Sequence, residues 1–94
     1  MEDKFLTQHP QGKRGVSMSR AKYGLIRETI LELIRDYGEI SLTELLMRCE
    51  QMLVNKLEGS ISWYTTWVKL DLESRGEIER VPNASPQKIR LKQG

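Results

Sequence analysis

Apolar residues recur at steps of three and four along three stretches of the chain, the spacing that places them on one face of an α-helix. The first stretch begins after Ser19, whose hydroxyl can accept a hydrogen bond from a free backbone N–H of the first turn. It ends before Gly38, a residue type suited to the left-handed conformation that follows many helices. We therefore predict a first helix over residues 19–37 with an apolar stripe of Tyr23, Ile26, Ile30, Leu33, Ile34 and Tyr37.

The second stretch opens with Ser41-Leu42-Thr43-Glu44, which matches a capping box. In that motif Ser41 accepts from a backbone N–H and Glu44 reaches back to the N–H of Ser41. Gly59 breaks the stripe that follows, and the short segment 39–41 fits a brief strand before the helix. The predicted second helix has an apolar stripe of Leu42, Leu45, Leu46, Cys49, Met52 and Leu53.

A third helix is predicted from Ser60 to about Arg75, with Gly76 as its stop. At 100° per residue this helix carries two apolar stripes that cannot face the same core. The stripe expected to face the core consists of Ile61, Tyr64, Val68 and Leu72, and the stripe on the roughly opposite side consists of Trp63, Trp67 and Leu70. The remaining face carries Ser62, Thr66, Lys69 and Glu73.

After Gly76 the apolar period changes to two, which predicts strands over residues 77–81 and 87–91 joined by the turn-forming segment 82–86. Residues 1–18 show no period, and we expect an irregular basic arm there, followed by a domain over residues 19–94. The expected fold class is α+β and mainly α, with three helices, a short strand before the second helix and a C-terminal β-hairpin.

Composition narrows the class of protein without naming a function. The chain has 94 residues, of which 38% are hydrophobic and 30% charged, as in one ordinary globular domain. No apolar stretch approaches the ~18–20 residues that span a membrane, and the polar N-terminus argues against a signal peptide. The single cysteine, Cys49, cannot form an internal disulfide, and its place on an apolar stripe indicates a core residue. We therefore expect a cytoplasmic protein that has no membrane partner.

The segment from Tyr23 to Leu91 resembles winged-helix domains in its order of helix, short strand, helix, helix and hairpin. The most specific part is residues 67–80 (WVKLDLESRGEIER), which looks like the end of a winged-helix recognition helix followed by the glycine and first strand of the wing. This block, together with Lys22-Tyr23 at the start of the first helix, also looks like a small bacterial family of uncharacterised proteins with no assigned activity.

The resemblance implies that the third helix enters the DNA major groove and that the wing touches the backbone. The groove-facing residues would then be Ser62, Thr66, Lys69 and Glu73, with wing contacts from Arg80, Lys88 and Arg90. Lys13 and Arg14 lie beside glycines in the arm and could follow a DNA backbone.

Our leading hypothesis is a DNA-binding module of the small transcriptional-regulator type, which binds double-stranded DNA mainly through its phosphates. The net charge is only +2, but the positive charge gathers at the two ends of the chain. The groove-facing set holds one lysine and no arginine, and residues 82–86 hold no basic residue, so the sequence disfavours direct base readout.

A second hypothesis is a protein-interaction or self-association module, such as a homodimer, that has the same scaffold and does not bind DNA. Its evidence is the stripe of Trp63, Trp67 and Leu70, because exposed aromatic side chains mark interfaces. The two tryptophans could equally pack beneath the N-terminal arm, against Phe5, Leu6 or Val16, or stack on a base or ligand.

The sequence gives no catalytic or metal site. The one histidine, His9, lies beside Pro10 in the arm, and no His, Cys, Asp or Glu set has metal-ligand spacing. No glycine motif for phosphate binding is present. We therefore expect a protein that is not an enzyme and that needs no cofactor or metal.

Overall fold

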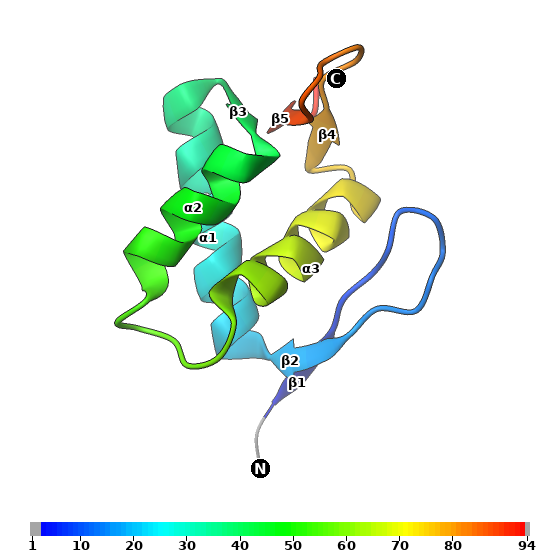
Figure 1. The fold of residues 1–94 in the computed structure, drawn as a ribbon. Helices are drawn as coiled ribbons and strands as arrows, with labels where there is room; N and C mark the ends of the chain where they lie inside the picture. Colours follow the sequence, from blue (N-terminus) through cyan, green and yellow to red (C-terminus); the bar gives the residue numbers. More distant parts are fainter. Residues whose placement is uncertain (1–2, 94) are drawn as a thin grey trace.

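The three predicted helices all form, and a serine hydroxyl caps each of them. In the computed structural model, which describes residues 3–93, the hydroxyls of Ser19, Ser41 and Ser60 accept from the backbone N–H three residues further on, at 3.1, 3.0 and 3.3 Å. Gly38 ends the first helix with φ +77°, and its N–H donates to the Ile34 carbonyl. The elements are β1 (Lys4–Leu6), β2 (Ser17–Ser19), α1 (Arg20–Tyr37), β3 (Glu39–Ser41), α2 (Leu42–Leu53), α3 (Ile61–Ser74), β4 (Ile78–Arg80) and β5 (Lys88–Leu91) (Figure 1).

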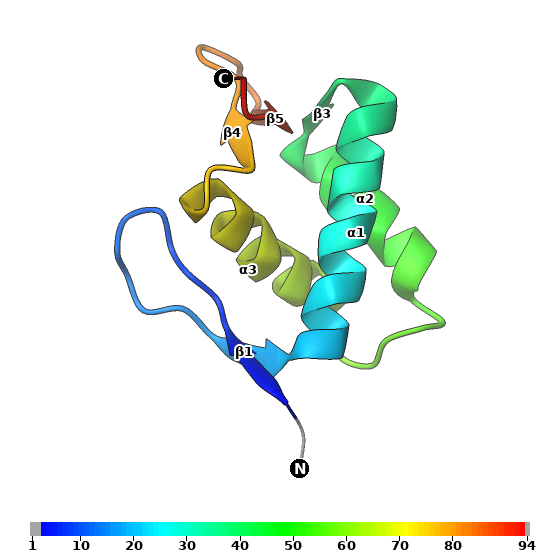
Figure 2. The same cartoon turned by 180° about the vertical axis from the view of Figure 1, so that it is seen from behind.

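The core lies between the three helices and the sheet that follows them. α3 packs against both α1 and α2, and α1 is seen along its length in Figure 2. Cys49 has no exposed surface, which confirms it as a core residue, whereas Met52 at the edge of the same stripe is exposed. The largest fully buried apolar side chains are Ile26, Ile30, Ile34, Leu45, Leu53, Leu72, Ile78 and Ile89.

The capping box of α2 forms only in part. Ser41 caps the helix as predicted, but the carboxylate of Glu44 accepts from Arg48 Nε at 2.7 Å. A hydrogen bond between two charged groups is stronger than one to a neutral N–H. The i, i+4 pair on the helix surface therefore replaces the reciprocal half of the box.

The strands at the C-terminal end form one antiparallel sheet with β3. The order is β3-β5-β4, with Ile40 opposite Ile89 and Ile89 opposite Arg80. Ile40, Ile78 and Ile89 are all buried, so one face of this sheet closes the core beneath the helices. The structure thus has three helices and antiparallel strands, as the α+β, mainly α prediction states.

The N-terminal arm, predicted to be irregular, contains two short strands, whereas residues 7–16 between them form no helix or strand. β1 and β2 form a two-stranded antiparallel sheet with Phe5 opposite Met18, and β2 leads directly into α1. The apolar positions are too few to show a period of two, but the buried Met18 and the half-buried Phe5 anchor the hairpin on the core. The predictions for residues 1, 2 and 94 lie outside the described part of the chain.

Gly15 allows the two sides of this hairpin to approach closely at Thr7, since a Cβ at position 15 would lie 1.8 Å from the carbonyl oxygen of Thr7. Gly15→Ala must displace the backbone of the hairpin, and we expect it to lower the free energy of unfolding by about 1–3 kcal/mol in urea denaturation. Gly24→Ala is the matched control, because a Cβ at Gly24 in α1 meets no atom within 4 Å. That control should raise stability by up to about 1 kcal/mol. Equal stability of the two variants would contradict this account of Gly15.

Candidate nucleic-acid interface

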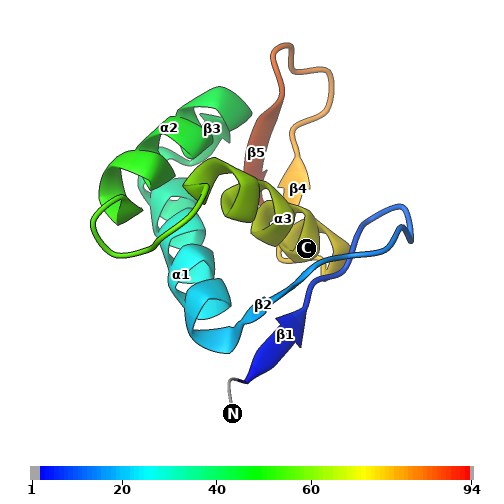
Figure 3. The ribbon, with the colours of Figure 1, turned by 60° about the horizontal axis from the view of Figure 1, so that its bottom comes forward.

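The helix α3 lies between the two β-hairpins, as Figure 3 shows. Its buried side carries Ile61, Thr65, Val68 and Leu72, which face the core. Its outer side carries Ser62, Thr66 and Leu70, which are partly exposed, and Trp63, which is 48% exposed. This exposed strip of α3, formed by Ser62, Trp63, Thr66 and Leu70, therefore contains no charged side chain.

Asp71 fixes the β1–β2 hairpin against α3. The side chain is 0% exposed, and its carboxylate accepts from the Gln8 backbone N–H at 2.8 Å, from Arg75 Nε at 2.9 Å and from the Tyr23 hydroxyl. Burial of the phenol and its hydrogen bond to Asp71 raise the pKa of Tyr23 above its ordinary value. One buried anion thus joins the hairpin, α1 and α3.

Phe5 packs beside this carboxylate cluster and not under the tryptophans. Its ring stacks on Tyr23 with centroids 4.0 Å apart. The guanidinium groups of Arg20 and Arg75 lie 5.2 and 5.0 Å from the same ring. These cation–π contacts cover the outer side of the junction between the hairpin and α1.

The two tryptophans have different surroundings. Trp67 is half-buried, and the ring of His9 from the β1–β2 loop meets it edge-on at 6.1 Å. Trp63 packs against Tyr64 with centroids 5.2 Å apart and leaves about half of its surface exposed. Of the arm residues expected to cover the tryptophans, Phe5 stacks on Tyr23 and Leu6 is exposed, whereas Trp67 meets the arm through His9.

Lys69 is not an exposed residue of α3, which corrects the expectation that it faces a DNA groove. It is only 2% exposed, and its ammonium group pairs with Glu73 one turn further along α3. Glu73 also lies 3.4 Å from Arg80 of β4. A buried lysine is stable only with such a partner, so this triad ties the β4–β5 hairpin to α3 instead of presenting charge to solvent.

Of the remaining predicted cations, Arg90 is also engaged within the chain. Its guanidinium lies 2.7 Å from Glu79 and 4.0 Å from Glu39, and this arginine holds the pKa of Glu79 below its usual value. Lys13, Arg14 and Lys88 are exposed and form no ion pair within residues 3–93. The unpaired cations of the predicted site therefore lie in the two hairpins and not on α3.

Thr66 and Ser62, the neutral members of the predicted face, remain on the outer side of α3. The Thr66 hydroxyl donates to the Ser62 carbonyl at 2.9 Å, so its one proton is used inside the helix. No charged side chain of α3 is free, since Lys69 and Glu73 pair with one another and Asp71 pairs with Arg75.

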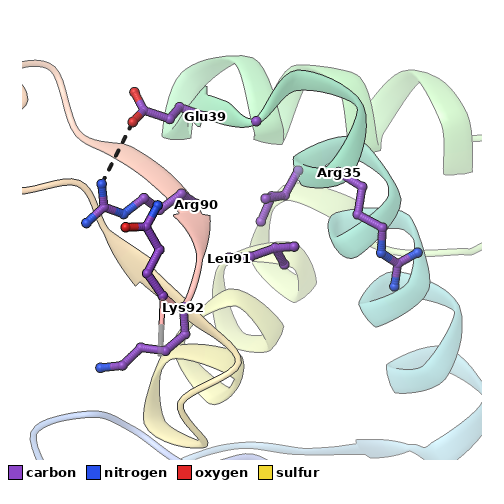
Figure 4. A pocket seen from close by; sticks show the side chains of 8 residues that line it. Arg35, Glu39, Arg90, Leu91 and Lys92 are labelled. Carbon is purple, nitrogen blue, oxygen red and sulfur yellow. Dashed lines mark ion pairs between the residues drawn. The ribbon is translucent and has the colours of Figure 1, made fainter.

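Two open hollows lie away from this strip. One, of about 360 Å³, lies between the end of α1 and β5, where Arg35 and Lys92 line it and the Arg90–Glu39 pair closes one side (Figure 4). The other, of about 390 Å³, lies between the β1–β2 loop and Ser74, and Lys13 and Arg14 line it. The second hollow places these two cations beside the C-terminal end of α3.

The described residues contain no group of three or more His, Cys, Asp or Glu side chains that could hold a metal ion. Burial raises the pKa of the Cys49 thiol to about 11, so the one sulfhydryl is neutral and enclosed at neutral pH. Within residues 3–93, no helix combines the length and the apolar character needed to cross a membrane.

Sequence reasoning missed Asp71, Gln8 and Tyr23 as the group that positions the site. One signal was available, because Asp71 lies between Leu70 and Leu72 in a helix with two apolar stripes. A charged residue at such a position must have partners when it is buried. The sequence does not show that its partners come from a hairpin more than sixty positions earlier.

Asp71→Asn should release the hairpin from α3. The variant loses the Arg75 ion pair and the charged acceptor of Tyr23 and Gln8, so we expect the free energy of unfolding to fall by about 2–3 kcal/mol. Urea denaturation measures the change, and hydrogen exchange at residues 4–19 should rise with it. Asp36→Asn, at an exposed carboxylate of α1, should change stability by less than about 0.5 kcal/mol. A loss of similar size in both variants would contradict the proposed role of Asp71.

Tyr23 should make stability fall in alkaline solution. The unfolded phenol loses its proton near pH 10, whereas the folded phenol, with its raised pKa, keeps it. Above about pH 10 the unfolded chain therefore binds fewer protons, and the free energy of unfolding should fall by up to about 1.4 kcal/mol per pH unit. Tyr23→Phe has no such proton, so its urea-unfolding curves should depend less steeply on pH. Identical pH dependence in both proteins would show that this hydroxyl is not the cause.

Comparison with known proteins adds a family but no activity. No curated protein and no solved structure matches the chain. Residues 4–89 match a family described as a family of unknown function (DUF6958), and the match covers the β1–β2 hairpin, all three helices, β3, β4 and the start of β5. Because this match covers most of its length, the chain belongs to the DUF6958 family of unknown function.

Proposed function

We propose that this chain is a DNA-binding module of the winged-helix type, in which α3 lies in the major groove and the two hairpins contact phosphates beside it. One observation carries the proposal: the exposed strip of α3 holds no free charge, while the unpaired Lys13, Arg14 and Lys88 lie in the hairpins on its flanks (Figure 3). B-DNA has the complementary layout, with phosphates along the walls of the groove and uncharged base edges on its floor.

The order of elements supports the winged-helix part of the proposal. α2 and α3 follow one another as a helix pair, and β4 and β5 form a hairpin directly after α3. β3, which precedes α2, pairs with β5 and so holds the hairpin in place against the helices. In winged-helix proteins that bind DNA, the equivalent of α3 is the recognition helix and the β4–β5 hairpin is the wing. We infer a small regulator of transcription as the matching role.

The charge inventory predicts weak and strongly salt-dependent binding. Three free cations release about three counterions when they neutralise phosphates, so log K against log salt concentration should have a slope of about −2 to −3. Arg80 and Arg90 contribute less because their acidic partners lie within the chain.

Isotope-labelled protein titrated with a ~20-base-pair duplex of random sequence, first at low salt and then near physiological salt, tests the proposal. We expect salt-sensitive amide shifts in residues 62–66, in the β1–β2 loop and around Lys88. A double variant, Lys13→Gln with Arg14→Gln, should make the salt slope less steep by about 2, because two phosphate contacts are lost. Arg35→Gln removes an exposed charge from α1, beyond the interface, and should leave the slope unchanged (Figure 4). Absence of shifts at low salt would refute DNA binding.

Self-association is the second candidate function, and the half-exposed Trp63 favours it. A large aromatic surface on the outer side of a helix is typical of protein interfaces. Under this alternative, α3 would pack against α3 of a second copy through Trp63 and Leu70. Sedimentation equilibrium without DNA separates the two candidates. A dimer that Trp63→Ala converts to a monomer supports self-association, and a monomer at all concentrations removes it.

A further inference from the structure

We infer that α3 reads the C5-methyl groups of thymine through Trp63, Thr66 and Leu70, so that the preferred ligand is A·T-containing duplex DNA. This inference rests on the proposed DNA-binding function and adds a sequence preference to it. The thymine methyl is the one apolar group on the floor of the major groove. The exposed strip of α3 offers mainly apolar surface to that floor.

Trp63 is the largest group on this strip and the best placed. It lies in the first turn of α3, and the N-terminal residues of a recognition helix are those that reach base edges. Tyr64 packs edge-on against the indole, and the Lys22 ammonium lies 4.0 Å from the centroid of the Tyr64 ring. The ring of Trp67 lies 6.1 Å away along the same helix. These neighbours hold the indole in one orientation while about half of it stays exposed.

Thr66 presents a methyl group one turn further along the helix. Its hydroxyl proton is already donated to the Ser62 carbonyl at 2.9 Å. The hydroxyl has no second proton for the O6 or N7 acceptor of guanine, so this partly exposed side chain is suited to apolar contact through its methyl group. Leu70 continues the apolar strip another turn along.

The same strip has no group that recognises guanine with two hydrogen bonds. Arg and Lys are the side chains that contact guanine O6 and N7 together, and α3 contains no arginine. Its single lysine, Lys69, is buried in the pair with Glu73. The donors left on the strip are the Ser62 hydroxyl and the Trp63 Nε1–H, and each can bind a single acceptor such as thymine O4.

The sharpest test removes only the methyl groups from the ligand. Two duplexes of the same A·T-rich sequence, one with thymine and one with uracil in every thymine position, have the same phosphates and hydrogen-bonding groups. Burial of one methyl group corresponds to about fourfold in affinity. We expect fluorescence anisotropy at low salt to show at least fourfold weaker binding of the uracil duplex.

Variants of Thr66 provide a matched pair for this measurement. Thr66→Ser keeps the hydroxyl and its bond to Ser62 but removes the methyl, so it should lower the thymine-to-uracil affinity ratio. Thr66→Val keeps a methyl and removes the hydroxyl, and the ratio should persist. Trp63→Ala should lower the ratio further than Thr66→Ser does, because it removes the largest group of the strip, and circular dichroism of each variant verifies its fold. The Lys13→Gln and Arg14→Gln double variant should weaken both duplexes equally and leave the ratio unchanged.

The outcomes separate the two proposals. Absence of binding to either duplex refutes the proposed function itself. Equal, salt-sensitive binding of both duplexes by the unmodified protein refutes thymine readout and leaves DNA binding in place. A ratio that Trp63→Ala and Thr66→Ser do not alter assigns the preference to another part of the chain and also overturns the inference.

Discussion

The carboxylate of Asp71 is shielded from solvent, and a buried anion is costly unless hydrogen bonds and opposite charge surround it. Its partners come from three places: the backbone of Gln8 in the β1–β2 hairpin, the hydroxyl of Tyr23 in α1 and the guanidinium of Arg75 just beyond α3. Each of these contacts helps to position the carboxylate for the others. The hairpin is therefore held against α3 as part of the fold.

A second charged cluster does the same on the other flank of α3. Lys69 and Glu73 are enclosed where α3 meets the β4–β5 hairpin, and Arg80 extends the cluster onto β4. Each hairpin is thus fastened to α3 by charged side chains that α3 itself supplies. As a consequence, the charged side chains of α3 are all paired within the chain, and its exposed strip, which begins near Trp63, is uncharged. Free positive charge remains at Lys13, Arg14 and Lys88 in the hairpins.

This distribution of charge links the architecture to the proposed function. A helix with free arginines would bind guanine edges, whereas a neutral strip between two basic hairpins fits a groove whose walls are charged and whose floor is not. The apolar character of the strip also suits contact with a second copy of the chain. Charge on the flanks favours DNA, because contact between two copies would bring like charges together around the interface.

Local pattern determined the secondary structure to within a few residues. The serine caps, the glycine stops at 38 and 76 and the change of period after Gly76 act within a few positions, so the sequence alone placed α1, β3, α2, α3 and the strands of the C-terminal hairpin. It also assigned Cys49 to the core, because burial follows directly from a helical stripe. The β1–β2 hairpin escaped prediction, since its strands are three residues each and too short to show a period. The burial of the charged residues depended on tertiary structure. Lys69 and Glu73 lie one turn apart on α3, so the sequence permits their ion pair, but whether the pair is exposed or buried depends on the elements that pack over it. For that reason the sequence could propose Lys69 as an exposed contact, while only the packing of the β4–β5 hairpin and α3 decided that it is buried against Glu73.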